Sequence, residues 1–234
     1  MQKASNLILL IETATTSCSL ALAEDGLILS KKELNEHNIH ASHVTLFIDE
    51  LMHLTGKTYS NLTAVAVSQG PGSYTGLRIG VSTAKGLCFA LDIPLIAVNT
   101  LQAMAAGLLE KTSLRNEKTL LCPMIDARRM EVYTALFDRD LATIENIQAK
   151  ILDETSFDKY LKNHTILFFG DGAEKCKPLY SHRPNTTFIE FENSASYLGV
   201  LAEQKLKSGD IEDVAYFEPY YLKDFIPTKP NVSS

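Results

Sequence analysis

Residues 7–12 read Leu-Ile-Leu-Leu-Ile-Glu, five apolar residues followed by a carboxylate. A short apolar run bounded by polar residues is typical of a strand buried on both faces. Further along the chain, Ile125-Asp126 aligns with Ile11-Glu12 at an offset of 114 residues. At the same offset, Ala135-Leu136 aligns with Ala21-Leu22. The recurrence predicts a tandem duplication with two similar lobes.

Working outward from these runs, both halves show the same order of expected elements. In the first half we expect strands at 7–11, 18–23, 27–34, 64–68 and 94–98, and helices at 40–54, 75–91 and 100–110. In the second half we expect strands at 120–125, 131–137, 142–150, 165–169 and 187–191, and helices at 154–161, 173–180 and 194–207. Each half therefore has the order βββαβαβα.

This doubled order describes an α/β fold, the duplicated ribonuclease-H-like fold of the actin or ASKHA type, which actin, sugar kinases and the Hsp70 ATPase share. We expect an N-terminal lobe of residues 1–100 with partner-binding helices, and a C-terminal lobe of residues 101–234 with a short flexible tail. In those proteins a nucleotide lies between the lobes, although fold alone does not establish that use. The candidate cleft residues are Glu12, Thr13, Gly70, Gly72, Asp126 and Arg128.

Composition favours a globular cytoplasmic protein. The chain has 234 residues, a hydrophobic fraction of 45% and a net charge of −6. Its lysines and arginines are scattered, so the chain alone should bind nucleic acid weakly. The four cysteines lie far apart and are expected to be reduced core residues. No apolar stretch approaches the roughly 20 residues that cross a bilayer, so we expect no membrane contact.

The segment from Ser68 to Gly80 leaves a strand and enters a helix. Gly70 and Gly72 suit a tight turn, and Ser73 or Thr75 can cap the helix. Such a turn can hold an anion at the helix N-terminus. It lacks the Gly-Lys-Ser/Thr ending of a P-loop, which disfavours a stand-alone NTPase. A purely structural turn is the other interpretation.

Small residues form a shallow groove along the helix that follows. Gly76, Gly80 and Ala84 are spaced four apart, beside an apolar core stripe. A glycine inside a helix lowers its stability by roughly 1 kcal/mol relative to alanine. The presence of glycine at positions 80 and 86 therefore requires an explanation. Close approach by another helix would supply one. Spacing leaves open whether that helix belongs to this chain, a second copy or another protein.

Two segments carry a family resemblance. Gly70 to Gly80 reads Gly-Pro-Gly-Ser-Tyr-Thr-Gly-Leu-Arg-Ile-Gly, and Asp126 to Tyr133 reads Asp-Ala-Arg-Arg-Met-Glu-Val-Tyr. Together they resemble the signature segments of the TsaB (YeaZ) family, and the resemblance covers nearly the whole chain. Ile11-Glu12-Thr13 stands where relatives often have Asp-Thr-Ser, and Tyr221-Leu222-Lys223 where many have Tyr-Leu-Arg.

The resemblance implies a scaffold subunit without catalytic activity or a cofactor. The related TsaD family holds a metal through a His-x-x-x-His pair after a Val-Asn dipeptide. Here Thr100 and Met104 stand at the two histidine positions. A hydroxyl and a thioether replace imidazole poorly as ligands of iron or zinc, so no metal site is expected.

The resemblance also implies partners. A TsaD homologue would bind the N-terminal lobe, and a TsaE-type ATPase would join the assembly. The complex would form threonylcarbamoyladenosine next to the anticodon of tRNAs reading ANN codons, and this chain would contact tRNA only through the complex. Alone, it would form a homodimer through the same lobe. The expected interface residues are His40, His43, Phe47, Gly76, Arg78, Gly80 and Ala84.

Two enzyme hypotheses stand beside the scaffold. Older names call the family glycoproteases, so one alternative is a metal-dependent glycoprotease-like hydrolase. His37, His40 and His43 form the only tempting cluster, but on a helix His37 and His43 diverge by about 120°. The other is a small-molecule kinase in which Glu12 and Asp126 organise magnesium. Those carboxylates equally suit turn and hydrogen-bond roles.

Overall fold

The computed structural model describes residues 5–35, 40–112 and 116–223. Its strands are β1 (Leu7–Glu12), β2 (Ser17–Glu24), β3 (Leu27–Asn35), β4 (Ala64–Gly70), β5 (Leu95–Asn99), β6 (Thr119–Asp126), β7 (Glu131–Phe137), β8 (Thr143–Ile151), β9 (Thr165–Phe169) and β10 (Thr186–Ile189). Its helices are α1 (His40–Thr55), α2 (Tyr74–Leu91), α3 (Thr100–Lys111), α4 (Asp158–Leu161), α5 (Lys177–Tyr180) and α6 (Gly199–Ser208), with 3-10 turns η1 (Tyr59–Asn61), η2 (Asp171–Cys176) and η3 (Ala195–Leu198). His37 and the predicted flexible tail after Phe225 lie outside the described residues.

The strands form two sheets of the same topology, which confirms the predicted duplicated α/β fold. The first sheet has the order β3-β2-β1-β4-β5 and the second the order β10-β9-β6-β7-β8. In each, the first three strands of the half are antiparallel, and the next two add in parallel. Parallel strands need crossover helices, and the helices after β4 and β9 supply them.

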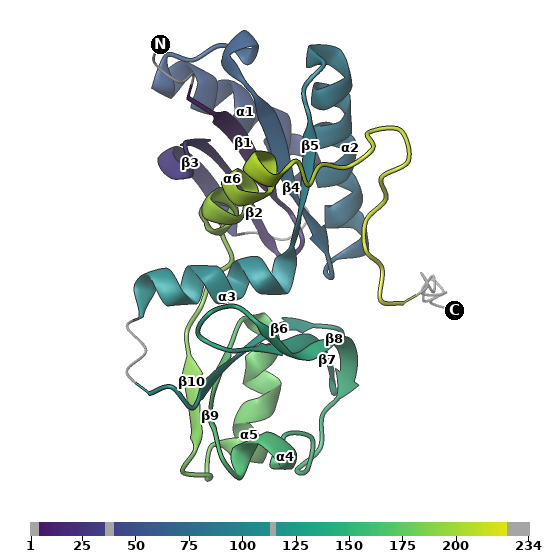
Figure 1. Cartoon of the computed structure of the whole chain (residues 1–234). Coiled ribbons are helices and arrows are strands. Elements are labelled where there is room, and N and C mark those ends of the chain that lie inside the picture. The colour runs from purple at the N-terminus through teal and green to yellow at the C-terminus, as the bar shows by residue number, and fades with distance from the viewer. Residues whose placement is uncertain (1–4, 36–39, 113–115, 224–234) are drawn as a thin grey trace, which may run out of the picture.

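The first sheet is covered on both faces. Leu7, Leu9 and Ile11 of β1 point into a core shared with α1 and α2. Ile8 and Leu10 point to the other face, where η3 and α6 pack. In Figure 1, α6 lies in front of this sheet and α1 behind it.

The last helix of each half packs against residues of the other. Helix α6, from the second half, covers the first sheet. Helix α3, from the first half, contributes Leu101 and Met104 to the core of the second sheet, and it lies between the two sheets in Figure 1. The exchange ties the halves together, and the division into lobes at residues 100 and 101 stays a prediction.

Three helices of the second half are shorter or more broken than predicted. The helix expected at 154–161 is the single turn α4, because the Asp153 carboxylate accepts bonds from the Thr155 and Ser156 side chains and holds a turn. The helix expected at 173–180 is split into η2 and α5, and Pro178 at the start of α5 has no N–H to donate. The helix expected at 194–207 begins as η3.

The C-terminal segment, residues 209–223, returns across the first lobe. Glu212 forms an antiparallel bridge with Leu95 at the edge of the first sheet. The Lys85 ammonium then donates to the carbonyls of Ala215 and Phe217, at 3.2 and 2.9 Å. Figure 1 shows this yellow segment passing beyond β5 and α2. It ends at an ion pair between Lys223 and Glu131 of β7, which links the first lobe to the second.

No helix in the described ranges is long and apolar enough to span a bilayer.

Candidate functional site

The turn between β1 and β2 fills the space beside the glycine loop. The Ser73 amide donates to the Ala14 carbonyl at 2.7 Å. A Cβ at Gly72 would fall well inside 3.0 Å of that same carbonyl oxygen, and a Cβ at Gly70 inside 3.0 Å of the Tyr220 carbonyl oxygen. The loop after β4 is therefore a tight structural turn packed by its own chain. That Gly70 and Gly72 also line a nucleotide cleft stays a prediction.

Helix α2 packs through its small residues against the same turn. Gly76, Gly80 and Ala84 are buried. A Cβ at Gly76 would collide with the Thr13 carbonyl oxygen, and one at Gly80 with the Thr13 hydroxyl. The close approach that the spacing required is made by this chain. The prediction that these three residues form a groove for a partner is wrong.

Glu12 and Thr13 have no exposed surface. The Glu12 carboxylate accepts the Ala14 amide at 2.6 Å and the Ser68 hydroxyl. Burial raises the pKa of the Glu12 carboxyl, and these two hydrogen bonds only partly oppose the rise. The prediction that Glu12 and Thr13 line a cleft is wrong, because neither can reach a ligand. Glu12 instead links the end of β1 to β4 through its hydrogen bond with the Ser68 hydroxyl.

The positions of the sibling family's metal ligands are occupied by structural contacts. The Thr100 hydroxyl accepts the Gly70 amide at 3.2 Å, and Met104 is buried in the core of the second sheet. Across the described ranges, no three His, Cys, Asp or Glu side chains are grouped as a metal would require. Burial also raises the pKa of the Cys18 thiol to about 11 and that of the Cys176 thiol to about 12. Neither thiol is suited to nucleophilic chemistry.

Two of the predicted interface residues of α1 have side chains that the structure describes. Phe47 is buried in the first core, so the prediction that it faces a partner is wrong. His43 is half-buried and packs edge-on against the Phe47 ring, with 5.5 Å between the centroids. His40 begins α1, but its side chain lies outside the described part of the chain.

The exposed residues of α2 lie on the side opposite Thr13. We call Thr75, Arg78, Ser82, Gly86 and Phe89 the outer face of α2; all five are exposed. Phe89 is 85% exposed, and a Cβ at Gly86 would meet nothing within 4 Å. The Arg78 guanidinium lies 4.2 Å from the Tyr74 ring centroid and donates to the Tyr221 hydroxyl at 3.2 Å. The prediction that Arg78 contributes to an interface stays open, and Phe89 was missed, although its place outside the apolar stripe could have indicated it.

The turn between β6 and β7 carries the second signature segment. Arg128 and Arg129 have φ angles of 69° and 50°, the left-handed region that glycine and asparagine favour. Each such residue costs roughly 1–2 kcal/mol. Asp126 holds the turn, because its carboxylate accepts the Arg128 amide at 2.6 Å and the Lys175 ammonium at 2.8 Å. Asp126 and Arg128 are exposed, and Arg129 was not among the residues predicted for the cleft.

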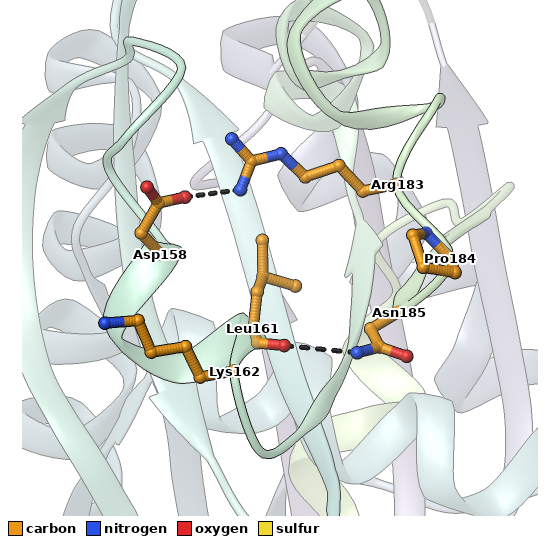
Figure 2. A pocket seen from close by; sticks show the side chains of 6 residues that line it. All are labelled: Asp158, Leu161, Lys162, Arg183, Pro184 and Asn185. Carbon is orange, nitrogen blue, oxygen red and sulfur yellow. Dashed lines mark hydrogen bonds and ion pairs between the residues drawn. The ribbon is translucent and has the colours of Figure 1, made fainter.

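A separate hollow of about 340 Å³ lies in the second lobe. Figure 2 shows its lining, in which Arg183 pairs with Asp158 and the Asn185 amide donates to the Leu161 carbonyl at 3.1 Å. None of the predicted site residues lines it. Arg183 is neutralised by Asp158, whereas the exposed Lys162 ammonium forms no ion pair with the described residues.

Comparison with known proteins identifies the family. A family model described as TsaD, tRNA N6-adenosine threonylcarbamoyltransferase, matches residues 28–225. The tRNA threonylcarbamoyladenosine biosynthesis protein TsaB of Bacillus subtilis (strain 168) is 32% identical, over 92% of this chain and 93% of that protein. The chain belongs to the TsaB family. For TsaB of Escherichia coli (strain K12) the identity is 38%, but the match covers 57% of this chain and about half, 55%, of that protein.

Solved structures confirm the fold of this TsaB-family chain. YeaZ from Pseudomonas aeruginosa superposes with a TM-score of 0.75 at 24% identity, over 93% of this chain and 100% of that one. An inorganic polyphosphate/ATP-glucomannokinase from Arthrobacter has a TM-score of 0.50 at 11% identity, over 87% of this chain and 99% of that one. At these identities the likeness shows the fold alone.

Proposed function

We propose that this chain is a non-catalytic scaffold subunit for the formation of threonylcarbamoyladenosine next to the anticodon of tRNAs reading ANN codons. The observation that carries the proposal is the filled space beside α2. Thr13 and Ala14 pack against the glycine loop and α2, and Thr100 and Met104 have structural partners. A chain without an accessible reaction centre contributes by binding the protein that has one.

The partner in this proposal is a TsaD homologue. A tRNA N6-adenosine threonylcarbamoyltransferase from Halalkalibacterium halodurans is 37% identical over 40% of this chain. Two related proteins of the same fold can pack through equivalent helices, as the two subunits of a symmetric homodimer do. A TsaE-type ATPase then joins the pair, and tRNA reaches the assembly in the cytoplasm.

The outer face of α2 supports this docking surface. An interior glycine costs a helix roughly 1 kcal/mol, and Gly86 has no neighbour within 4 Å that would require a glycine. The close approach of a partner helix would require a glycine at this position. Phe89 follows one turn later with 85% of its surface exposed, and aromatic residues such as phenylalanine are enriched in protein interfaces. The same face would join two copies of the chain, so homodimer and heterodimer should compete.

Replacing Phe89 by aspartate should abolish partner binding without unfolding the chain. The Phe89 ring is almost fully exposed, so its loss costs the monomer little. A buried aromatic anchor in an interface contributes about 2 kcal/mol or more, which corresponds to roughly a 30-fold weaker complex. Co-purification and calorimetry with the TsaD homologue measure the loss, and light scattering should show a monomer.

The matched control is Ile151→Asp at the end of β8. Ile151 is 72% exposed and lies in the second sheet, away from α2. This variant should bind the TsaD homologue as the unmodified chain does. If Phe89→Asp also retained the homologue at full affinity, the proposed docking surface would be wrong.

A further inference from the structure

The turn from Ala127 to Met130 presents two charges that have no partner in the described chain. Arg128 and Arg129 are both exposed, and within residues 5–35, 40–112 and 116–223 neither guanidinium has a hydrogen bond, an ion pair or an aromatic contact. The left-handed backbone at both positions favours glycine or asparagine over arginine. Folding alone therefore disfavours arginine at both positions, which indicates that the side chains serve another purpose.

The surrounding contacts hold this turn in place. The Lys175 ammonium donates to the Asp126 carboxylate at 2.8 Å and to the Glu131 carbonyl at 3.0 Å. Just after β8, the Leu152 amide donates to the Met130 carbonyl at 2.8 Å. Strained backbone persists where neighbours determine it in this way. The backbone that carries the two arginine side chains is therefore held in place.

The acidic residues on either side do not neutralise the arginines. Asp126 is paired with Lys175, and Glu131 is paired with Lys223 from the C-terminal segment. Two positive charges therefore remain at the tip of the turn, although the whole chain has a net charge of −6. This local excess would attract an anion that the rest of the surface repels.

We propose that Arg128 and Arg129 contact the phosphodiester backbone of the tRNA in the assembled complex. This inference rests on the proposed function, which brings tRNA to the complex. The guanidinium group matches phosphate with two parallel donors. An exposed turn has no walls to hold a free phosphate against water, whereas an RNA strand offers successive phosphates and releases counterions on binding. The contact would orient the RNA without reading its sequence.

The test uses the complex of the full chain with its TsaD homologue and a transcript of a tRNA that reads an ANN codon. The variant R128G/R129G removes both charges and places glycine where the backbone is left-handed, so the isolated chain should melt at the same or a higher temperature. At moderate salt, the variant complex should bind the tRNA roughly tenfold more weakly. The slope of log affinity against log salt should become shallower by about 1.5, as expected for two lost phosphate contacts.

Two controls separate charge from position. R128K/R129K keeps both charges and should retain most of the affinity. R139Q removes an exposed arginine from the turn between β7 and β8 and should leave both affinity and slope unchanged. An R128G/R129G complex with the affinity and salt slope of the unmodified one would overturn the inference.

Co-purification with the TsaD homologue distinguishes a failure of the tRNA-contact inference from a failure of the proposed function. If R128G/R129G no longer retained the TsaD homologue, the arginines would serve protein contact and the inference would be overturned. If the unmodified complex assembled but bound no tRNA, the inference would fail while the docking proposal stood. If the unmodified chain did not retain the homologue at all, the proposed function would fail first.

Discussion

Replacing Gly76 by alanine is expected to lower the free energy of unfolding by about 3 kcal/mol or more, although alanine is the best helix former. The added Cβ would fall well inside 3.0 Å of the Thr13 carbonyl oxygen. That oxygen belongs to a buried backbone turn, which the bond from the Ser73 amide to the Ala14 carbonyl holds against α2. Because neither backbone can give way cheaply, either α2 or the turn must move, and both are part of the first core.

The matched control is the same substitution at Gly86, ten residues along the same helix. A Cβ there meets nothing within 4 Å. Gly86→Ala should therefore raise the free energy of unfolding by up to about 1 kcal/mol, through helix propensity alone. Urea unfolding followed by circular dichroism measures both. Two shifts of the same sign and similar size would show that the Thr13 contact does not determine the role of Gly76.

The positions of the strands could be predicted from the sequence because their signal is local. Runs such as Leu7 to Ile11 are apolar at every position, and the 114-residue repeat places an equivalent run at the start of the second half. The helices of the second half were harder to predict. Competing side-chain bonds at Asp153 and the missing amide of Pro178 shorten elements whose apolar spacing still looks helical. Those effects depend on a few polar atoms, which periodicity does not register.

The candidate site shows a different limit. The spacing of Gly76, Gly80 and Ala84 correctly indicated that something approaches α2 closely, but it does not say what. The approaching group is Thr13, which lies more than sixty positions earlier in the chain. Only the pairing of β1 with β2 and β4 brings that turn to the helix. Gly86, which the same cost argument singled out, is a glycine of α2 whose Cβ position has no neighbour within 4 Å in the described residues.

Glu12 is the second position where a small change should have a large effect. Glu12→Ala removes the acceptor for the Ala14 amide and the Ser68 hydroxyl and leaves a cavity, so we expect a loss of about 3 kcal/mol. Glu12→Gln should act in the opposite direction at neutral pH. Its amide is neutral, has nearly the same shape, and can both accept from Ala14 and donate to the Ser68 oxygen.

The sign follows from proton linkage. Burial raises the pKa of the Glu12 carboxyl above its ordinary value of 4.5, so the folded chain holds a proton that the unfolded chain has released. The stability that this proton provides is complete below the ordinary pKa and is lost as the pH rises through the raised pKa. Above that value, the buried carboxylate is charged and the folded state bears its desolvation.

The glutamine variant cannot lose this stability, because it does not titrate. At neutral pH it should be more stable than the unmodified chain, because it does not bear the desolvation of a buried carboxylate. The difference should shrink as the pH is lowered toward 4.5, where Glu12 is protonated in the folded chain. Urea unfolding of both chains across this range measures the difference at each pH, and other titrating groups cancel in the comparison. A difference that stayed constant with pH would mean that the Glu12 carboxyl has the same pKa in the folded and the unfolded chain, and the raised pKa would be wrong.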